Sequence, residues 1–466
     1  MAASAVQICS TNPANPDDVV GTFVPGGGID VDRAVTAAAA ATDWAAAAGQ
    51  ARADALSLVA GRVESRAGEL ASLVCREVGK PIAEARGEVA RTAAIFRYHA
   101  QAALDPDGET YPPGDGRSLL MTRRRPRGVV GLITPWNFPL AIPAWKLAPA
   151  LAYGNACVWK PSPLAPACAE ALMSCLEPEL PAAVVQLVQG GADAGVALAG
   201  HAGLGAVSFT GSAAAGAAVA RQAADRGVAA QCEMGGQNAS IVLADADVGR
   251  AAAIIARAAM GYAGQKCTAT SRVIAERAVA AGVRDALVAE IDGLVVENPD
   301  DPACEVGPLI TGEAREAAVA AVQRAGESGA RLLTGGTALA GAGHYLAPAL
   351  LDVADPASEL AQEEVFAPVA ALLEARDASH AVELTNGVRY GLSTSVFTGD
   401  LDRVIELAGR IDTGLVRVNQ PTSGVDLHAP FGGEKASGLG PREQGKAARE
   451  FYTSLRTILV SPAVLE

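Results

Sequence analysis

The stretch Gly128-Val-Val-Gly-Leu-Ile-Thr-Pro-Trp-Asn-Phe-Pro139 decides the fold of this 466-residue chain. Its first half is a short apolar run, typical of a buried strand, and its second half is a turn that ends in proline. The same change from apolar run to turn and helix follows residues 156–160, 184–188 and 206–209. Strands that alternate with helices predict a parallel sheet covered on both faces, so the predicted fold class is α/β.

The other segments are arranged around this sheet. Residues 31–104 repeat apolar positions at intervals of three and four, which predicts long amphipathic helices. A second alternation of strands and helices runs from about residue 238 to residue 431. Residues 118–125 and 451–460 each predict a strand, and we expect the two to pair as an edge ribbon that another subunit completes.

Composition excludes several classes of function. The formal net charge of −14, without a basic stripe, argues against nucleic-acid binding, and Arg123-Arg124-Arg125 is expected to be a solvated strand edge. No apolar run is long enough to span a membrane, and no secretory signal opens the chain. The eight cysteines have no CxxC spacing and no His-rich partner set, so we expect neither disulfides nor a metal site, and a reduced cytoplasmic location.

One cysteine, Cys267 in the segment GYAGQKCTATSR (261–272), stands among small and polar neighbours. A lone cysteine is usually a small buried hydrophobe, so its surroundings must justify any other role. Several further motifs provide that justification. In chain order they are TPWNFP (134–139), WKPSP (159–163), SFTGS (208–212), EMGGQN (233–238), EEVFAP (363–368) and PFGG (430–433).

In this order the motifs resemble those of the aldehyde dehydrogenase superfamily, nearly end to end, with Glu77, Gly79-Lys-Pro81 and Glu84 also matching. The Cys267 segment and the PWNFP loop are most similar to bacterial α-ketoglutaric semialdehyde dehydrogenases and related enzymes. The resemblance implies a Rossmann-type cofactor domain, an α/β catalytic domain and a small oligomerisation β-ribbon, in a homodimer or homotetramer. We place these parts at residues 1–107 with 127–235, at 236–450, and at 108–126 with 451–466, respectively.

Chemistry and resemblance together assign three catalytic residues. Hydride leaves an aldehyde carbon readily only from a tetrahedral oxyanion, so Cys267 is predicted to form a thiohemiacetal and then a thioester. The resemblance implies that the Asn137 amide and the backbone N–H of Cys267 hold the oxyanion, each donor contributing about 3 kcal/mol. Glu233 is predicted to activate the water that hydrolyses the thioester. Cys232 is expected to pack in the core and Lys266 to be structural.

The cofactor site lacks a GxGxxG turn, the usual dinucleotide signature. The resemblance implies a variant in which the FTGS turn begins a helix whose N–H groups and dipole face the pyrophosphate. It also implies the set of cofactor contacts. These are Ile133, Thr134, Pro135, Trp136, Lys160, Ser162, Pro163, Gly191, Gly195, Gly211, Ser212, Gly235, Glu364 and Phe366.

The choice of cofactor depends on one departure from the family pattern. Many members carry a glutamate where this chain has Pro163, and that carboxylate binds ribose hydroxyls and repels a 2′-phosphate. Without it, Lys160 and Ser162 are free to attract a phosphate. We therefore predict that NADP is preferred or that both NADP and NAD are used, rather than NAD alone.

The predicted substrate is a small aldehyde, with a semialdehyde and a broad range of aldehydes both open. Thr422, Ser423 and His428 lie where the family's substrate loop is expected, and His428 is either a pocket donor or a packing residue. No arginine directly follows the Asn137 loop to bind a carboxylate. Two other functions stay open: a CoA-acylating or reductive relative, against which Glu233 argues, and a catalytically idle binding protein.

Overall fold

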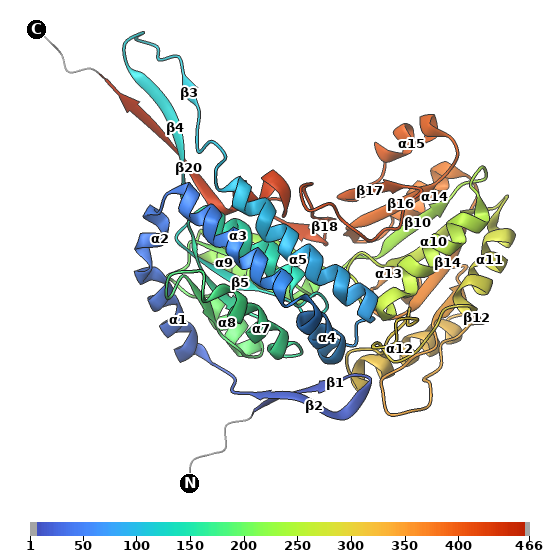
Figure 1. Cartoon of the computed structure of the whole chain (residues 1–466). Coiled ribbons are helices and arrows are strands. Elements are labelled where there is room, and N and C mark those ends of the chain that lie inside the picture. Colours follow the sequence, from blue (N-terminus) through green and yellow to red (C-terminus); the bar gives the residue numbers. More distant parts are fainter. Residues whose placement is uncertain (1–6, 462–466) are drawn as a thin grey trace, which may run out of the picture.

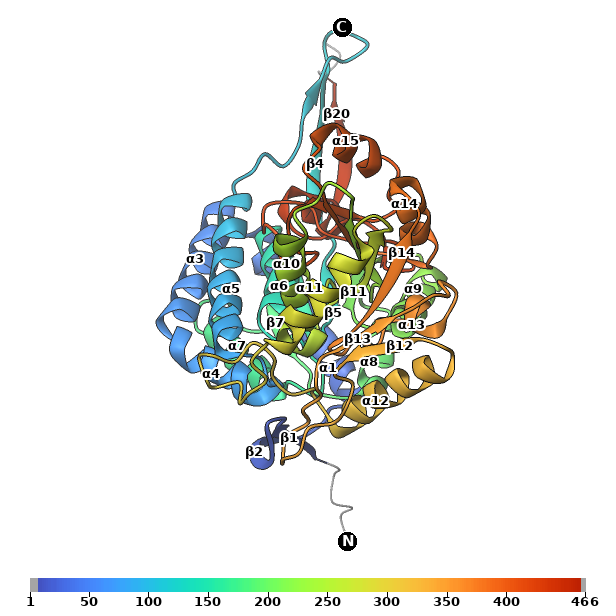
Figure 2. The same cartoon turned by 90° about the vertical axis from the view of Figure 1, so that its right-hand side faces the viewer.

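The computed structural model describes residues 7–461. Two lobes, each built on a largely parallel sheet, lie side by side, and a narrow ribbon projects from the body (Figures 1 and 2). The predicted α/β class is therefore confirmed. Within the described residues, no helix has both the length and the apolar character needed to cross a membrane.

The first sheet has six strands in the order β19-β9-β8-β5-β6-β7. The strands are β5 (Val129–Ile133), β6 (Ala156–Lys160), β7 (Val185–Leu187), β8 (Ala206–Thr210), β9 (Ala229–Glu233) and β19 (Gly438–Leu439). All neighbours pair in parallel except β19, which is antiparallel to β9. From β5 the chain adds β6 and β7 on one side of the sheet, and then adds β8 and β9 on the other side of β5. The topological switch therefore lies between β5 and β8. Ligands of open α/β sheets bind at the carboxyl ends of the strands at such a point.

Helices cover both faces of this sheet because its central strands are mostly apolar on both sides, with successive residues pointing to opposite faces. Val130 and Leu132 of β5 pack into a core with the helices of one face, while Val129 and Ile133 pack into a second core on the other. The first group is α2 (Thr42–Ala46), α3 (Gly49–Ser65), α4 (Ala67–Val78), α5 (Ile82–Ala102), α6 (Ala141–Ala152) and α7 (Pro166–Leu176). The second group is α1 (Gly28–Ala40), α8 (Ala192–Ala199) and α9 (Ala213–Asp225). The long helices predicted for residues 31–104 are present.

The second sheet has seven strands in the order β12-β13-β14-β11-β10-β16-β17, parallel except for the β12–β13 pair. The strands are β10 (Asn238–Val242), β11 (Thr270–Glu276), β12 (Arg331–Thr334), β13 (Ala349–Asp352), β14 (Val369–Ala375), β16 (Ser393–Phe397) and β17 (Leu415–Val418). The helices of this lobe are α10 (Val248–Met260), η1 (Gly261–Gly264), α11 (Ala280–Asp292), α12 (Gly312–Glu327), α13 (Glu359–Gln362), α14 (Ala378–Asn386) and α15 (Leu401–Ala408). A small pair, β15 (Tyr390–Gly391) and β18 (Glu434–Lys435), lies apart from the sheet.

The projecting ribbon is a three-stranded antiparallel sheet of β3 (Thr110–Tyr111), β4 (Leu119–Pro126) and β20 (Thr453–Val460). The predicted pairing of the two long strands is confirmed, from Thr453 opposite Pro126 to Val460 opposite Leu119. The C-terminal strand begins two residues later than predicted, because Phe451 and Tyr452 end α16 (Ala448–Tyr452), which follows η2 (Gly445–Ala447), with both rings in the first core. The chain starts with a hairpin, β1 (Ile8–Asn12) and β2 (Asn15–Phe23), at the end of the molecule away from the ribbon tip (Figure 1).

Candidate active site

The three predicted catalytic residues sit on loops and strand ends that the two lobes turn toward each other. Asn137 follows β5 and Glu233 is the last residue of β9, while Cys267 lies between η1 and β11. The Asn137 side-chain amide donates to the carbonyl of Gln265, 2.9 Å away and two residues before the cysteine. From the other side, the Asn238 amide donates to the carbonyl of Cys267 at 2.8 Å. These bonds join the Asn137 loop, the Cys267 loop and the segment after Glu233.

Cys267 differs from the other seven cysteines in its surroundings. It is half-buried beside a cavity, whereas six others are fully buried and Cys9 is exposed. Cys232 is one of the buried six and packs with Phe209 and Met234, as expected. Burial, with the carboxylates of Glu364, Glu233 and Glu443 nearby, raises the pKa of the Cys267 thiol to about 12. The resting thiol is therefore protonated at neutral pH, and a nucleophilic role requires a base to accept its proton.

Glu233 has the properties of such a base. Its side chain is buried, and its Oε2 accepts a hydrogen bond from the Gly433 N–H at 3.0 Å. Burial and the neighbouring Glu443 raise its pKa well above 4.5, against the opposing effect of the Gly433 N–H. Gly432 leaves room for this carboxylate, since a Cβ there would lie 2.6 Å from Glu233 Oε1. A raised pKa makes this carboxylate a stronger base than an ordinary glutamate, as a proton acceptor requires.

A buried ion pair behind Glu233 was not anticipated from the sequence. Lys146 Nζ pairs with Glu443 and donates to Ser208 Oγ at 2.7 Å, and both charged side chains are inaccessible to solvent. Glu443 raises the pKa of Glu233 and Lys146 lowers it, so the pair influences the protonation of the candidate base. The signal in the sequence is a single lysine inside the otherwise apolar helix AIPAWKLAPALA. Such a lysine must be buried with a partner.

A cavity of about 400 Å³ opens onto Cys267. Its wall combines aromatic rings with polar groups, among them Phe138, Trp145, Phe431, Arg91, Thr268 and Ser423. Lys266 also lines it, but its Nζ is paired with Glu84 at 2.7 Å, which is consistent with the structural role expected for this lysine. Thr422 is buried and bonded to Thr270 Oγ1 at 2.9 Å, and His428 is exposed and does not line the cavity. Of the three predicted loop residues, only Ser423 faces this space.

Arg91 is the polar residue of this cavity that sequence reasoning missed. Glu84, Gly87, Glu88 and Arg91 line the cavity together, because spacings of three and four place them on one face of α5. Glu84 and Glu88 are each paired with a lysine, whereas among the described residues no carboxylate forms an ion pair with Arg91. Its guanidinium donates to the Val425 carbonyl, and burial lowers its pKa. The signal available in the sequence was this helical spacing.

The nicotinamide-side candidates cluster at the ends of β5 and β9. Glu364 accepts a hydrogen bond from the Gly236 N–H at 3.1 Å, and burial raises the pKa of its carboxyl to about 7. A side chain at Gly235 would overlap this carboxylate, which explains the glycine there. Phe366, in a left-handed conformation with φ 56°, meets the Trp136 ring edge-to-face at 5.8 Å between centroids.

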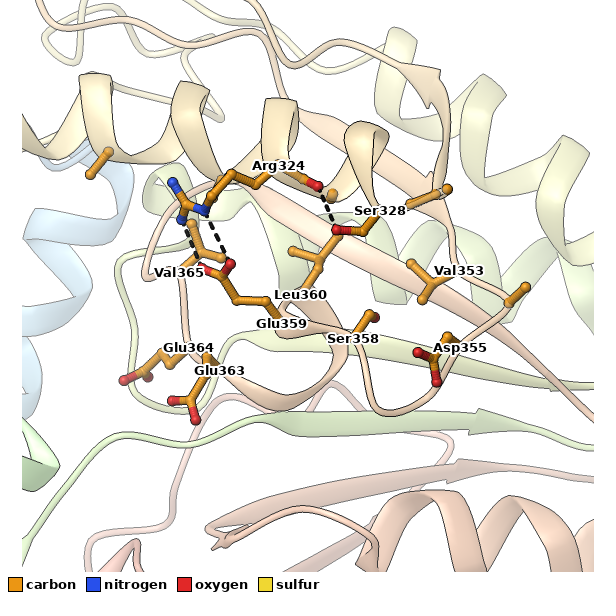
Figure 3. Close-up of a pocket in the computed structure, with 16 residues that line it drawn as sticks. Arg324, Ser328, Val353, Asp355, Ser358, Glu359, Leu360, Glu363, Glu364 and Val365 are labelled. Atoms are coloured by element: carbon orange, nitrogen blue, oxygen red, sulfur yellow. Dashed lines mark hydrogen bonds and ion pairs between the residues drawn. The ribbon is translucent and has the colours of Figure 1, made fainter.

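The hollow beside Glu364, about 230 Å³ in volume, lies between α12 and the loop around α13 (Figure 3). Arg324 and Glu359 pair across it at 2.7 Å, while Glu363 and Glu364 extend at a distance from that pair. The charged groups of this hollow are satisfied within the protein, since Glu363 is paired with Arg389. The candidate active cavity is therefore the one lined by Cys267.

The adenosine-side candidates lie at the ends of β6 and β8. Lys160 is buried, and within the described residues it has neither an ion-pair nor a hydrogen-bond partner; burial lowers its pKa to about 8. A Cβ at Gly195 would lie 3.7 Å from Lys160 Cδ, and Gly191 precedes the first turn of α8. Ser212 caps α9 by accepting from the Ala215 N–H at 3.4 Å, which leaves the first N–H groups of that helix free for an anion.

Other predicted contacts are placed consistently with these. Ile133 ends β5 and pairs with Lys160, and Thr134 Oγ1 accepts from the Trp159 indole at 2.9 Å. The Gly211 N–H donates to the Glu233 carbonyl at 3.1 Å, which ties the FTGS turn to the candidate base. A buried lysine that has no side-chain partner in the described part of the chain and a helix N-terminus at the topological switch fit an elongated phosphate-bearing cofactor.

Known proteins resemble this chain in both sequence and fold. The model of the aldehyde dehydrogenase family matches residues 1–458. The chain is 41% identical to an alpha-ketoglutaric semialdehyde dehydrogenase of Bacillus subtilis, covering 97% of this chain and 94% of the relative. It is 39% identical to an alpha-ketoglutarate semialdehyde dehydrogenase of Haloferax volcanii, covering 96% and 94%. The structure of betaine aldehyde dehydrogenase from Staphylococcus aureus in complex with NAD+ superposes with a TM-score of 0.95 at 29% identity, covering 98% and 92%.

The chain therefore belongs to the aldehyde dehydrogenase family. It is an NAD(P)-dependent aldehyde dehydrogenase, an oxidoreductase that oxidises an aldehyde with a nicotinamide dinucleotide. The predictions of family, fold and enzyme class are confirmed.

Proposed function

We propose that this enzyme oxidises a short semialdehyde with a carboxylate at its far end, of the α-ketoglutaric type, to the dicarboxylic acid. The observation that carries this proposal is Arg91 in the wall of the cavity that opens onto Cys267, a cation that forms no ion pair among the described residues, although the charge of Asp426 opposes the lowering of its pKa by burial. A guanidinium binds a carboxylate through two parallel hydrogen bonds, and such bonds strengthen away from water. The names of the relatives from Bacillus subtilis and Haloferax volcanii support the same substrate class.

In the proposed reaction, the Cys267 thiol transfers its proton toward Glu233 and attacks the aldehyde carbon. The thiol pKa of about 12 makes this base necessary, and the raised pKa of Glu233 makes the carboxyl a suitable acceptor. The Asn137 amide uses one hydrogen on the Gln265 carbonyl and keeps a second. That second hydrogen and the backbone N–H of Cys267 are proposed to hold the oxyanion.

A nicotinamide dinucleotide, when bound, would supply the hydride acceptor, which is chemistry that the side chains cannot provide. Once Glu233 has released the thiol proton to solvent, it takes a proton from the water that attacks the thioester carbonyl. The bond from this carbon to sulfur then breaks, Cys267 leaves as the thiolate, and Glu233 returns a proton to it. Water as the acceptor distinguishes this reaction from CoA acylation, so free acid is the expected product even when CoA is added. Glu364 and the Gly235-Gly236 segment are proposed to hold the nicotinamide end.

For the adenosine end we propose that NADP is preferred or that both cofactors are used. Support comes from Lys160, whose buried side chain has no partner in residues 7–461, and from Ser162, whose Oγ accepts from the Leu164 N–H at 3.2 Å and so keeps its own hydrogen for a phosphate. Pro163 brings no carboxylate to oppose a 2′-phosphate. An unpaired buried cation gains most from an anionic ligand.

The assembly, location and division of the chain are also proposals. Exposed Leu455 and Leu459 on β20, and Leu119 on β4, favour a homodimer or homotetramer built through the ribbon. All eight cysteines are free thiols, which favours a reducing compartment such as the cytoplasm. The division into a cofactor domain, a catalytic domain and a ribbon stays a prediction, and β19 shows that residues 438–439 join the first sheet.

The substrate proposal is tested with Arg91→Met and a pair of aldehydes of equal length, 2,5-dioxopentanoate and pentanal. Loss of a charge-assisted hydrogen bond costs about 1.5–3 kcal/mol, so kcat/KM for the carboxylated aldehyde should fall roughly 10- to 150-fold. Pentanal should be oxidised as before, which makes it the internal control for folding and chemistry. Equal losses with both aldehydes, or a wild-type enzyme that prefers pentanal, would contradict the proposal.

A further inference from the structure

Lys80 and Glu88 form a buried ion pair that the reaction described above does not use. Both side chains are inaccessible to solvent, and Lys80 Nζ is bonded to Glu88 Oε2. Burial lowers the pKa of Lys80, while Glu88 opposes that effect. A buried pair rarely contributes net stability relative to apolar residues of similar size, so its presence invites a role other than stability.

One arm of this pair holds the loop that carries Asn137. The second oxygen of Glu88 accepts the backbone N–H groups of Leu140 and Ala141, at 2.9 and 3.1 Å, where the loop enters α6. Phe138 directly follows Asn137 in the chain, and Lys80 Nζ lies 3.8 Å from the centroid of its ring. A cation over an aromatic face is attracted by the ring quadrupole, most strongly away from water.

The other arm holds the loop that leads to Cys267. The same Lys80 Nζ lies 4.6 Å from the centroid of the buried Tyr262 ring, which meets Phe138 edge-to-face at 6.4 Å. Tyr262 and Ala263 both have left-handed backbones, with φ 54° and 52°, a conformation that side chains disfavour and surrounding contacts must maintain. The Tyr262 carbonyl accepts the Gln265 N–H at 3.1 Å, and the Gln265 carbonyl accepts the Asn137 amide.

We infer that Lys80 and Glu88 act as a positioning pair for the oxyanion site: they fix the Asn137 loop and the Cys267 loop relative to each other. Neither residue needs to touch the substrate's reacting atoms. The cation contacts one ring from each loop, and the carboxylate fixes the point where the first loop becomes a helix. This inference rests on the oxyanion role proposed for Asn137.

The experiment is a double-mutant cycle with hydride transfer as its readout. Lys80→Met with Glu88→Gln removes both charges together, so no unpaired charge stays buried, and the glutamine oxygen can still accept the Leu140 and Ala141 N–H groups. We measure the pre-steady-state burst of reduced cofactor at saturating aldehyde in wild type, in this charge-free variant, in Asn137→Ala and in the combination. Coupled residues deviate from additivity, whereas independent ones do not.

The charge-free variant should lose at least tenfold in burst rate, with the cofactor Kd within twofold of wild type. In the Asn137→Ala background, the same two substitutions should cost less than twofold, since the group that they position is already gone. A purely structural pair would give additive losses in both backgrounds, and that result would overturn the inference alone. An unchanged burst in Asn137→Ala would overturn the proposed oxyanion role as well, so the two failures are distinguishable.

Two controls keep the test valid if folding is affected. Val63 is buried on α3, outside both loops, so Val63→Ala should lower the melting temperature without touching the oxyanion site. The burst rate of this variant shows how much a loss of stability alone affects hydride transfer. Phe138→Leu removes one of the two ring faces while leaving the ion pair intact. It should show a smaller loss with the same dependence on Asn137, and a loss that persists in the Asn137→Ala background would count against the positioning role.

Discussion

Replacing Glu233 with glutamine tests the candidate base with little disturbance of the fold. Glutamine keeps the side-chain volume, and its Oε1 can accept the Gly433 N–H that Glu233 accepts at 3.0 Å. General-base catalysis contributes about 10²- to 10⁴-fold, so kcat should fall by about that factor. This loss corresponds to a rise of about 3–5 kcal/mol in the activation free energy. Because Glu233 is proposed to accept the thiol proton as well as to activate the water, the burst of reduced cofactor should slow together with steady-state turnover.

The same substitution has an expected sign for stability. Burial and Glu443 hold the pKa of Glu233 above 4.5, so the folded state favours the neutral acid over the carboxylate. As the pH rises above 4.5, the Glu233 carboxyl ionises in the unfolded chain before it ionises in the folded protein. The wild type therefore loses stability as the pH rises toward the pKa of Glu233 in the folded state. Glutamine carries no such penalty, so the variant should melt at the same or a higher temperature at pH 7.

Stopped-flow absorbance of the reduced cofactor, with product analysis, measures the effect on activity, and Cys232→Ala serves as a control at the adjacent buried thiol. In wild type, kcat should rise with pH as Glu233 ionises, with a midpoint above 4.5, and the glutamine variant should lack this rise. Unchanged steady-state turnover in Glu233→Gln, with the same pH dependence, would refute the reasoning.

Two further substitutions test the cofactor site. Gly235→Ala should displace the Glu364 carboxylate and raise the cofactor KM at least tenfold, since an added Cβ overlaps that carboxylate; an unchanged KM would show that Glu364 does not hold the cofactor. Pro163→Glu should lower kcat/KM for NADP at least tenfold and leave NAD unaffected or improved, because a carboxylate near Lys160 neutralises the cation and repels a 2′-phosphate. Equal effects on both cofactors, or a wild type with a hundredfold preference for NAD, would contradict this assignment.

Much of the fold and the reacting groups could be predicted from the sequence because they depend on local patterns. The apolar runs before residues 134 and 161 predict parallel strands wherever they occur, and the motifs of Asn137 and Glu233 lie at the carboxyl ends of such strands. Cys267 and Glu233 belong to short motifs with the residue types that a nucleophile and a base require, and the family resemblance implied Asn137 as the oxyanion donor.

Only the tertiary structure decided how these groups are surrounded. Arg91 enters the substrate cavity because α5 packs across the entrance to Cys267, 176 positions further along the chain by the numbering. Lys80 contacts Phe138 and Tyr262, which lie 58 and 182 positions further along the chain by the numbering, and no local pattern predicts these contacts. A side chain's chemical nature is local, but its burial and its partners depend on which distant segments fold against it, and these set its charge and its role.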